Sequence, residues 1–393
     1  MPANAPGSFR IAMVIDVWDD VANGAVVSTR RFTELLRERG HTVTVLAGGV
    51  PAPGKIVLPS FTIPLADGIM RKMRFLFAWP DRRVLSAAFA KHDLVHVQMP
   101  FYLGMRAVVI ARKMGRPVVS TFHVLAENVL HNVGIKNQPM VDLVYRLWLG
   151  TVFNRSDHVI CPSAFAEAEL RRYGLRVPTT VISNGVPEQF RRVPGELLAE
   201  DGKFVVLTVG RLAIEKRHDL IVDAIRRSRH EQRIQLVILG DGPLREKLTV
   251  RARGLTNPPR FGFVPSDELP RYYSAADLFI HAAEVELEGM SVLEAMACGA
   301  PCLIARAPKS ASSEFAPDPR YLFESGSVED LTQKIDSLLD HPEHLKEAGA
   351  AAARVAREYR IERSLARLER VYDTFAGVSP VSGARRDTLE QRR

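Results

Sequence analysis

Two glutamates, Glu286 and Glu294, lie eight positions apart within the stretch from Ala276 to Ala305. The stretch has the pattern of a buried strand, a short acidic loop, a helix, a Gly-Ala-Pro stop and a second buried strand. In open α/β sheets, ligands bind outside the carboxyl ends of the strands, where loops lead into helices. The free N–H groups of a helix start bind anions such as a diphosphate, and neighbouring carboxylates accept hydrogen bonds from sugar or ribose hydroxyls. The combination predicts a nucleotide-sugar site.

A pair of cations occurs in a second stretch, VGRLAIEKR, which follows the strand predicted at Phe204 to Val209. Arg211 can fork onto a diphosphate, and Lys216 can add a point charge. Together they can neutralise the charge that grows on a departing nucleoside diphosphate. A cation at a helix start is otherwise unfavourable, so Lys216 needs an anion, and its neighbour Glu215 is the alternative to a ligand.

The acidic residues also have structural interpretations. Ser291 and Glu294 have the spacing of a capping box, in which a helix-start serine and a glutamate three residues later satisfy backbone donors. The other three, Glu284, Glu286 and Glu288, can be exposed loop acids.

Two further candidates lie in the first half of the chain. The loop from Asp16 to Gly24 follows a predicted strand and opens a helix, so Gly24 would allow a phosphate to approach the backbone, although a simple turn explains it as well. His123 follows another predicted strand and can be a structural residue or a ligand contact. The chain contains no G-x-G-x-x-G, Walker loop, zinc spacing or Ser-His-Asp set.

A basic amphipathic stretch runs from Pro64 to Arg83. It fits an interfacial membrane contact and fits equally well a solvated basic face over a buried stripe. An RNA-binding patch is less well supported because no nucleic-acid motif accompanies it. The candidate acceptor or membrane residues are Arg71, Lys72, Arg74, Phe75, Phe77 and Trp79.

Length and composition limit the protein class. The 393 residues suggest two domains, and the net charge of +8 indicates anionic partners. Three cysteines without a paired framework favour a reducing cytosol. Neither a signal peptide nor an apolar run long enough to span a bilayer is evident, so we expect a soluble or peripheral protein.

Strand and helix patterns alternate in both halves of the chain, which predicts an α/β fold of two doubly wound domains facing across a cleft. Polar, Pro-containing sequence from Val186 to Gly202 is the predicted linker. The expected domains are residues 1–188 and residues 189–360. A final helix, 361–376, is expected to pack back on the first domain, and residues 377–393 to form a disordered tail.

These motifs, in their order along the chain, resemble retaining glycosyltransferases of family 4, which have the GT-B fold of two Rossmann-like domains. The resemblance covers the chain from its first strand to about Phe375. It rests on ANGAVVSTRRFTELLRERGHTVTVLA, DLVHVQMPFYLG, VVSTFHV, VICPSAFAEAELRRYG, VISNGV, LTVGRLAIEKRHD, LVILGDGPLREKL and LEAMACGAPCLIA.

The resemblance implies roles for individual residues. Glu286 would hold the donor-sugar hydroxyls and Glu294 the ribose, and Arg211 and Lys216 would bind the diphosphate. The implied catalytic residues are His123, Arg211, Lys216 and Glu286. The implied donor-binding residues are Gly24, Gly210, Arg211, Lys216, Glu286, Glu288, Gly289, Met290, Ser291 and Glu294.

One motif departs from the family. Family members commonly have E-G-F-G where this chain has Glu286-Leu287-Glu288-Gly289, so either glutamate could take the first role. The run around Lys309-Ser310-Ala311 is similar to the branch that acts on diacylglycerol lipids.

The expected function is therefore a retaining transfer of a hexose from a UDP- or GDP-sugar to a hydroxyl acceptor, a membrane lipid such as diacylglycerol or a glycolipid. We expect a peripheral protein on the cytosolic face of the membrane, with no cofactor, no required metal and no nucleic-acid partner. No carboxylate nucleophile is evident in the first half, which favours a front-face route. The alternatives are a transferase for a soluble acceptor, a nucleotide-sugar epimerase, a phosphorylase and a non-catalytic binding module.

Overall fold

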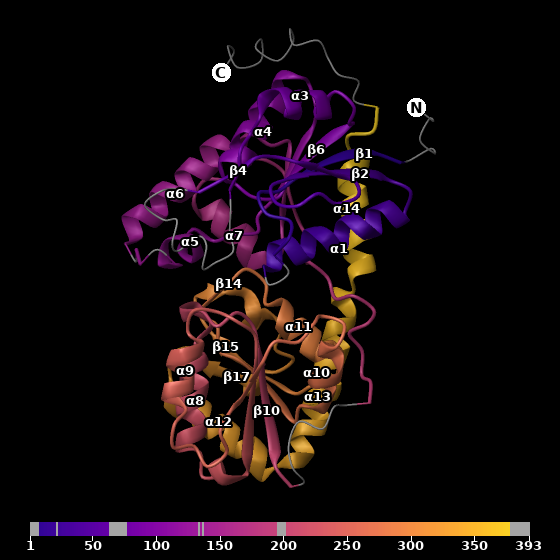
Figure 1. The fold of residues 1–393 in the computed structure, drawn as a ribbon. Coiled ribbons are helices and arrows are strands. Elements are labelled where there is room, and N and C mark those ends of the chain that lie inside the picture. The colour runs from indigo at the N-terminus through magenta and orange to yellow at the C-terminus, as the bar shows by residue number, and fades with distance from the viewer. Residues whose placement is uncertain are drawn as a thin grey trace. The chain divides into compact units, whose positions relative to one another are not determined.

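The computed structural model describes residues 8–20, 23–62, 77–132, 134–135, 137–194 and 202–377. The chain divides into two compact units (Figure 1). The N-terminal unit comprises residues 1–182 and 365–393, and the C-terminal unit residues 183–364. Residues 378–393 of the expected disordered tail lie outside the described part of the chain.

The N-terminal unit is built on a parallel sheet of seven strands in the order β3-β2-β1-β6-β7-β8-β9. Short apolar runs form these strands because both faces of a parallel sheet are covered. The strands are β1 (Arg10–Val14), β2 (Thr42–Ala47), β3 (Lys55–Val57), β6 (Leu94–Val97), β7 (Val118–Thr121), β8 (His158–Cys161) and β9 (Thr179–Val181). A separate antiparallel pair joins β4 (Ser60–Phe61) and β5 (Phe77–Ala78).

Helices cover this sheet, and one of them comes from the far end of the chain. They are α1 (Gly24–Glu38), α3 (Arg82–Phe89), α4 (Tyr102–Lys113), α5 (Ala126–Asn132), α6 (Gln138–Thr151), α7 (Ala164–Arg172) and α14 (Ile361–Asp373). Leu365, Leu368 and Tyr372 of α14, which share one helix face, pack in the same core as Ile11 and Met13 of β1. The end of the chain therefore completes the core of the N-terminal unit.

The C-terminal unit has a parallel sheet of six strands in the order β12-β11-β10-β13-β15-β17. The strands are β10 (Phe204–Val209), β11 (Ile234–Leu239), β12 (Arg260–Gly262), β13 (Leu278–His281), β15 (Cys302–Arg306) and β17 (Leu322–Glu324). The helices are α8 (His218–Arg227), α9 (Arg245–Arg251), α10 (Leu269–Ala275), α11 (Met290–Ala297), α12 (Val328–Asp340) and α13 (Pro342–Ala356). The two parallel sheets confirm the predicted α/β class.

Successive side chains of β10 enter two different cores because they point to opposite faces of the sheet. Val206 joins the core under α8, α9 and α12, whereas Val205 and Leu207 join the core under α10, α11 and α13. Figure 1 shows these two helix layers on opposite faces of the C-terminal sheet. The strand order reverses between the neighbours β10 and β13, so the loops after these two strands flank a topological switch point.

The chain crosses between the units twice, and the two crossing segments lie side by side. Val186 N donates to Tyr359 O at 2.8 Å, and Ile361 N donates to Val186 O at 3.2 Å. Gly185 has a φ of +75°, and a Cβ at this position would lie 2.5 Å from the Ile361 Cα. A side chain at residue 185 is therefore excluded by both backbone conformation and space.

We expect Gly185→Ala to lower the melting temperature far more than the matched variant Gly254→Ala. Gly254 has a φ of +84°, but a Cβ there meets nothing within 4 Å. Gly254→Ala should cost about 1–2 kcal/mol, the price of a left-handed alanine. Gly185→Ala should cost roughly 1–3 kcal/mol more, because the Ile361 backbone has to move. Thermal unfolding followed by circular dichroism measures both, and equal shifts would contradict the packing argument.

Candidate active site

An ion pair joins the two loops at the switch point of the C-terminal unit. Lys216 ends the 3-10 turn Ile214–Lys216 that follows β10, and Glu286 ends the short strand β14 (Val285–Glu286) that follows β13. The Lys216 Nζ lies 2.5 Å from the Glu286 Oε2, and the two side chains are 19% and 18% exposed. The anion that Lys216 meets is therefore Glu286, from the other loop, rather than the neighbouring Glu215 that the sequence offered.

Further contacts hold the same two loops together. Glu284 N donates to Glu215 O at 2.8 Å, and the Arg217 guanidinium forms ion pairs with Glu284 and Asp219. Arg217 has a left-handed backbone, with a φ of 50°, which turns the chain from the 3-10 turn into α8. Because of this turn, α8 begins two residues after the predicted helix start at Lys216. Sequence reasoning missed the role of Arg217, since the partner that ties it to the other loop, Glu284, is 67 residues away.

Glu286 is held in its ionised form. Burial alone would raise the pKa of Glu286, but Lys216 and, to a smaller extent, His281 lower it below its ordinary value. A short strand pairing fixes its backbone, because β14 runs parallel to β16 (Lys309–Ser310) with Glu286 opposite Ser310. The site therefore presents a fixed carboxylate that accepts hydrogen bonds beside a fixed ammonium group.

Two neutral histidines lie next to the ion pair. Burial lowers the pKa of His281, the last residue of β13, to about 4, and that of His218, the first residue of α8, to about 3. Within the described residues, neither His281 Nε2 nor His218 Nδ1 has a hydrogen-bond partner. Sequence reasoning missed both, although a polar residue that ends a buried strand, as His281 does, was an available signal.

Glu288 faces a different partner from Glu286. It is 2% exposed, and its carboxylate accepts hydrogen bonds from Asn184 N at 3.1 Å and from Asn184 Nδ2 at 2.5 Å. Burial raises its pKa to about 7, against the opposing effect of hydrogen bonds from Ser183 and Asn184. The interpretation of Glu288 as an exposed loop acid is therefore wrong. This carboxylate joins the loop between β14 and α11 to Asn184, just after the chain first passes from one unit to the other.

The helix α11 begins two residues earlier than a capping box at Ser291 requires. Its N-cap is Gly289, with a φ of 92° and no side-chain cap, so Met290 and Ser291 are the first two helical residues. The capping-box interpretation of Ser291 and Glu294 is therefore wrong. Glu294 is buried inside the helix, where it accepts a hydrogen bond from the Tyr273 hydroxyl at 3.3 Å.

Two glycines allow close packing around the site. A Cβ on Gly289 would lie 2.3 Å from the Ser312 Oγ, in addition to the strain of its positive φ. The second is Gly240, where a Cβ would lie 1.9 Å from the carbonyl oxygen of Gly210, the residue that follows β10. The half-buried Arg211 follows at this packed turn, five residues before Lys216.

The remaining predicted residues, Gly24 and His123, belong to the N-terminal unit. Gly24 is the exposed first residue of α1, and the side chain of Asn23 caps that helix by accepting from Ala25 N at 3.0 Å. His123 follows β7, and its Nε2 lies 3.0 Å from the Gln98 Oε1. Burial lowers the pKa of His123 to about 4, so its ring is neutral near pH 7.

Asp16, just after β1, is a buried acid that the sequence reasoning named only as the start of a loop. Burial raises its pKa to about 7, and its Oδ1 accepts from Ala78 N at 3.4 Å. Its position directly after a buried strand was the available signal.

Four of the candidate membrane residues, Arg71, Lys72, Arg74 and Phe75, lie outside the described residues. The other two are described. The Phe77 ring stacks on Phe61 at a centroid distance of 5.7 Å, and Trp79 is 50% exposed.

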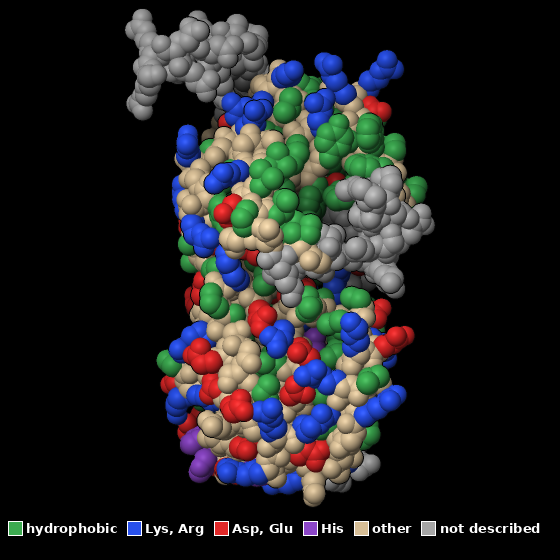
Figure 2. All heavy atoms as spheres, turned by 90° about the vertical axis from the view of Figure 1, so that its left-hand side faces the viewer, with side chains coloured by type: hydrophobic (Ala, Val, Ile, Leu, Met, Phe, Trp, Pro, Cys, Tyr) green, Lys and Arg blue, Asp and Glu red, His purple; other side chains and the backbone are tan. Residues whose placement is uncertain are grey.

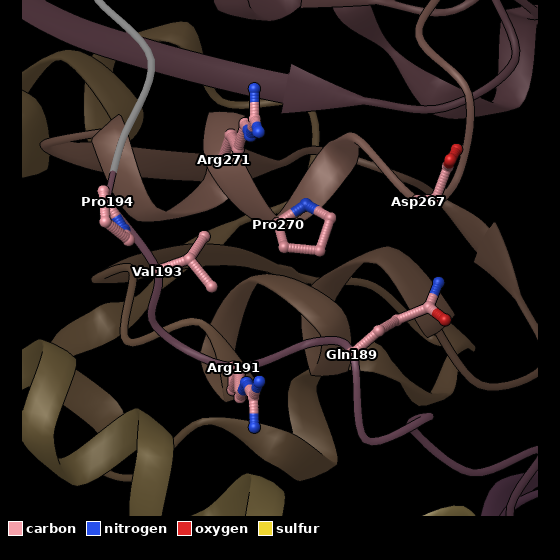
Figure 3. A pocket seen from close by; sticks show the side chains of 7 residues that line it. All are labelled: Gln189, Arg191, Val193, Pro194, Asp267, Pro270 and Arg271. Atoms are coloured by element: carbon pink, nitrogen blue, oxygen red, sulfur yellow. The ribbon is translucent and has the colours of Figure 1, made fainter.

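Other features of the described chain give little sign of a second site. One surface pocket of the C-terminal unit contains none of the predicted site residues (Figure 3). It is lined by Gln189, Arg191, Val193, Pro194, Asp267, Pro270 and Arg271. Among the described residues, no three His, Cys, Asp or Glu side chains cluster in a way that could hold a metal ion. No described helix combines the length and the apolar character that crossing a bilayer requires.

Comparison with known families decides the identity. A model described as "Glycosyltransferase Family 4" matches residues 22–190, and one described as "Glycosyl transferases group 1" matches residues 189–355. The chain belongs to glycosyltransferase family 4. It is a glycosyltransferase, as its two parallel-sheet units and the motifs at its switch point led us to expect.

Similar proteins include an enzyme whose name refers to a diacylglycerol lipid. The family-4 chain is 28% identical over 327 residues to the alpha-monoglucosyldiacylglycerol synthase of Streptococcus pneumoniae, covering 75% of this chain and 70% of that protein. It is 28% identical over 353 residues to sulfoquinovosyl transferase SQD2 of Arabidopsis thaliana, covering 84% of this chain and 66% of that protein.

The fold has solved counterparts. The crystal structure of Anabaena Alr3699/HepE in complex with UDP and glucose superposes with a TM-score of 0.74 at 18% identity, covering 93% of this chain and 100% of that one. This likeness confirms the GT-B fold of the family-4 chain.

We expect the stability of this glycosyltransferase to depend on pH through Glu288. Since the pKa of Glu288 is raised from 4.5 to about 7, the folded protein retains a proton that the unfolded chain releases. The associated stability is fully present below pH 4.5 and is lost as the pH rises through about 7. Its slope approaches ~1.4 kcal/mol per pH unit between these values.

Glu288→Gln should flatten this part of the stability profile, whatever its effect on absolute stability. The matched control is Glu246→Gln on the exposed face of α9, which should leave the slope unchanged. Melting temperatures at intervals from pH 4.5 to 8 measure the effect. Parallel profiles for the wild type and Glu288→Gln would show that the carboxyl group titrates as it does in the unfolded chain.

Proposed function

We propose that this protein is a retaining glycosyltransferase that moves a hexose from a UDP- or GDP-sugar to a hydroxyl of a membrane lipid such as diacylglycerol or a glycolipid. The bond between the sugar C1 and the diphosphate oxygen breaks, and a bond from C1 to the acceptor oxygen forms on the same face. The acceptor proton leaves with an oxygen of the nucleoside diphosphate. The protein supplies orientation and charge stabilisation, with no cofactor and no required metal.

The observation that carries the donor proposal is the Lys216–Glu286 pair at the switch point. Arg211 lies on the same loop, and the N-terminus of α11 begins three residues after Glu286 with its Gly289 cap free of any side chain. Two cations and a helix N-terminus on neighbouring loops form an environment that favours a diphosphate. In our proposal these groups stabilise the charge of the leaving group as the C1–O bond breaks.

The pair also suggests how the donor is recognised. Without a ligand, the ammonium of Lys216 and the carboxylate of Glu286 neutralise each other. A diphosphate carries more negative charge than one carboxylate and competes for Lys216. Glu286, whose lowered pKa keeps it ionised, then accepts hydrogen bonds from hydroxyls of the sugar. Glu288 is committed to Asn184, so we assign the first glutamate role to Glu286.

The roles of Glu294 at the ribose, and of Gly24 and His123 in the N-terminal unit, stay predictions from the family resemblance. A neutral His123 can donate one hydrogen bond to a sugar hydroxyl and accept another, which suits the expected sugar contact.

The acceptor proposal is supported by relatives rather than by geometry. A diacylglycerol glycosyltransferase and a sulfoquinovosyl transferase are among the similar proteins. The net charge of +8 favours an anionic surface. We propose peripheral attachment at the cytosolic face of the membrane, where nucleotide sugar and lipid meet.

The competition between Glu286 and diphosphate predicts opposite effects of two variants on nucleoside diphosphate affinity. Lys216→Gln should weaken UDP or GDP binding roughly tenfold or more, because a charged contact to phosphate is lost. Glu286→Gln should leave the affinity for nucleoside diphosphate unchanged or tighten it, because Lys216 no longer has a competing anion. The same variant should abolish the affinity that the nucleotide sugar gains over the nucleoside diphosphate through its sugar. Isothermal titration calorimetry measures both, with Lys247→Ala on α9 as the control for removing a lysine. Weaker nucleoside diphosphate binding in both variants would contradict the proposal that the diphosphate competes with Glu286 for Lys216.

The transfer itself is tested with purified protein, a panel of UDP- and GDP-hexoses, and diacylglycerol in detergent or vesicles. We expect a glycolipid product whose anomeric configuration, read by proton NMR, matches that of the donor, and loss of product in Glu286→Gln. A product of inverted configuration would exclude the retaining route. Conversion of the donor sugar without acceptor would indicate an epimerase, and transfer confined to soluble acceptors would overturn the lipid proposal.

A further inference from the structure

The helix α6 carries large apolar residues on both of its faces. Its inner face packs in the core through Val141, Tyr145 and Trp148. Its outer face exposes Met140, Leu143 and Leu147, which are 41%, 57% and 50% exposed. The spacing of three and four residues places the exposed side chains in one stripe. A surface helix normally exposes polar residues on its outer face, so these three apolar residues, which have the exposed Arg146 beside them, call for a partner.

A run of aromatic residues leads from the inner face of α6 to the protein surface. Phe101, the N-cap of α4, contacts Trp148 of α6 at a ring distance of 6.0 Å. The next residue, Tyr102, is 43% exposed and meets the half-exposed Trp79 at 5.8 Å. Tryptophan and tyrosine rings suit the boundary between hydrocarbon and water, because one end is apolar and the other polar.

The charges of the segment that contains α3 and α4, in the same unit as α6, are mostly positive. The segment from Trp79 to Arg116, which includes α3 and α4, contains seven Lys or Arg residues and two Asp residues. Arg82, Arg83, Arg112 and Lys113 are exposed. Figure 2 shows hydrophobic side chains gathered on the α6 side of the N-terminal unit, in the upper part of the view, with Lys and Arg along its upper rim.

We infer that the outer stripe of α6, together with Trp79 and Tyr102, docks on an anionic lipid bilayer. In this arrangement the aliphatic side chains enter the acyl boundary, the two rings lie at headgroup depth, and the cations of α3 and α4 face anionic lipids. A second copy of the chain would bring the same cations to the interface, which disfavours self-association through this face. The inference deepens the proposed function and rests on it for the lipid acceptor that such docking would bring within reach.

The test compares binding of the full chain to sedimentable vesicles of phosphatidylcholine with and without phosphatidylglycerol. We expect the wild type to bind the anionic vesicles at low salt. Leu143→Gln/Leu147→Gln should weaken binding at least tenfold, and Val250→Gln, an equally exposed aliphatic residue of α9, should not. Glutamine favours helix, so α6 is retained in the double variant.

A charge variant tests the cations separately. Arg82→Gln/Arg83→Gln should weaken binding to anionic vesicles and reduce its salt dependence, without loss of stability, since the two arginines begin α3, where cations are unfavourable. Equal vesicle binding by the wild type and the leucine variant, or no binding by the wild type, would overturn the inference. Light scattering that shows a wild-type dimer and a monomeric leucine variant would assign the stripe to a second copy and also overturn it.

The outcomes separate this inference from the proposed function. Nucleoside diphosphate affinity and transfer to detergent-dispersed lipid should be unchanged in the leucine variant, because α6 lies in the other unit from the donor loops. Vesicle binding that depends on Leu143 and Leu147, with no transfer to any lipid, would support docking and contradict the lipid acceptor. Lipid transfer without vesicle binding through α6 would support the lipid acceptor and contradict docking through α6.

Discussion

The ion pair between Lys216 and Glu286 is the constraint on which the candidate site depends. It joins the loop after β10 to the loop after β13, the two neighbouring strands at which the order of the sheet reverses. A half-buried ion pair is a weak source of stability, because removing both charges from water offsets much of their attraction. The same loops are already tied by Arg217 with Glu284 and by the backbone bond from Glu284 to Glu215. The extra pair therefore has its clearest explanation in ligand binding, where each charge can be exchanged for a ligand group.

The environment gives the three neighbouring acids of this region different properties. Glu286 stays ionised because Lys216 lies beside it, whereas burial keeps the pKa of Glu288 near 7 although Asn184 donates two kinds of N–H to it. Glu284 pairs with Arg217 at the edge of the loop. Assigning roles by environment rather than by residue type is the general logic of acid pairs in active sites. It supports our proposal that Glu286 is the carboxylate whose partner, Lys216, a ligand can take over.

Much of the fold could be predicted because it depends on local pattern. The strand at Phe204–Val209 was predicted with the bounds that the structure gives it, since buried parallel strands are short apolar runs between polar loops. The starts of α8 and α11 were not predicted correctly. They depend on left-handed residues, Arg217 and Gly289, whose conformations are fixed by contacts across the site rather than by helix-capping patterns.

The side-chain partners in the site were also hard to predict, because they depend on contacts between residues far apart in the sequence. Sequence spacing and family resemblance selected Lys216 and Glu286, and the structure brings these two together. Spacing could not reveal that Glu288 binds Asn184, because 104 residues separate them. His281 and His218 were missed for a related reason, because each matters through its burial beside the charged pair. The end of a buried strand gave a local signal for His281, but spacing could not show that either ring is buried beside Lys216 and Glu286.

The acid at position 288 shows how one motif position can change what supports a loop. Family members commonly have phenylalanine there, which can hold the loop only by apolar packing. In this chain a buried carboxylate accepts hydrogen bonds from the backbone and side chain of Asn184, next to the segment where Gly185 and Val186 pass Ile361 and Tyr359. Hydrogen bonds are directional and a buried carboxylate is costly without them, so this loop has one well-defined position. The next residue, Gly289, is the N-cap of α11. The position of the loop at Glu288 therefore also fixes the helix N-terminus to which we assign the diphosphate.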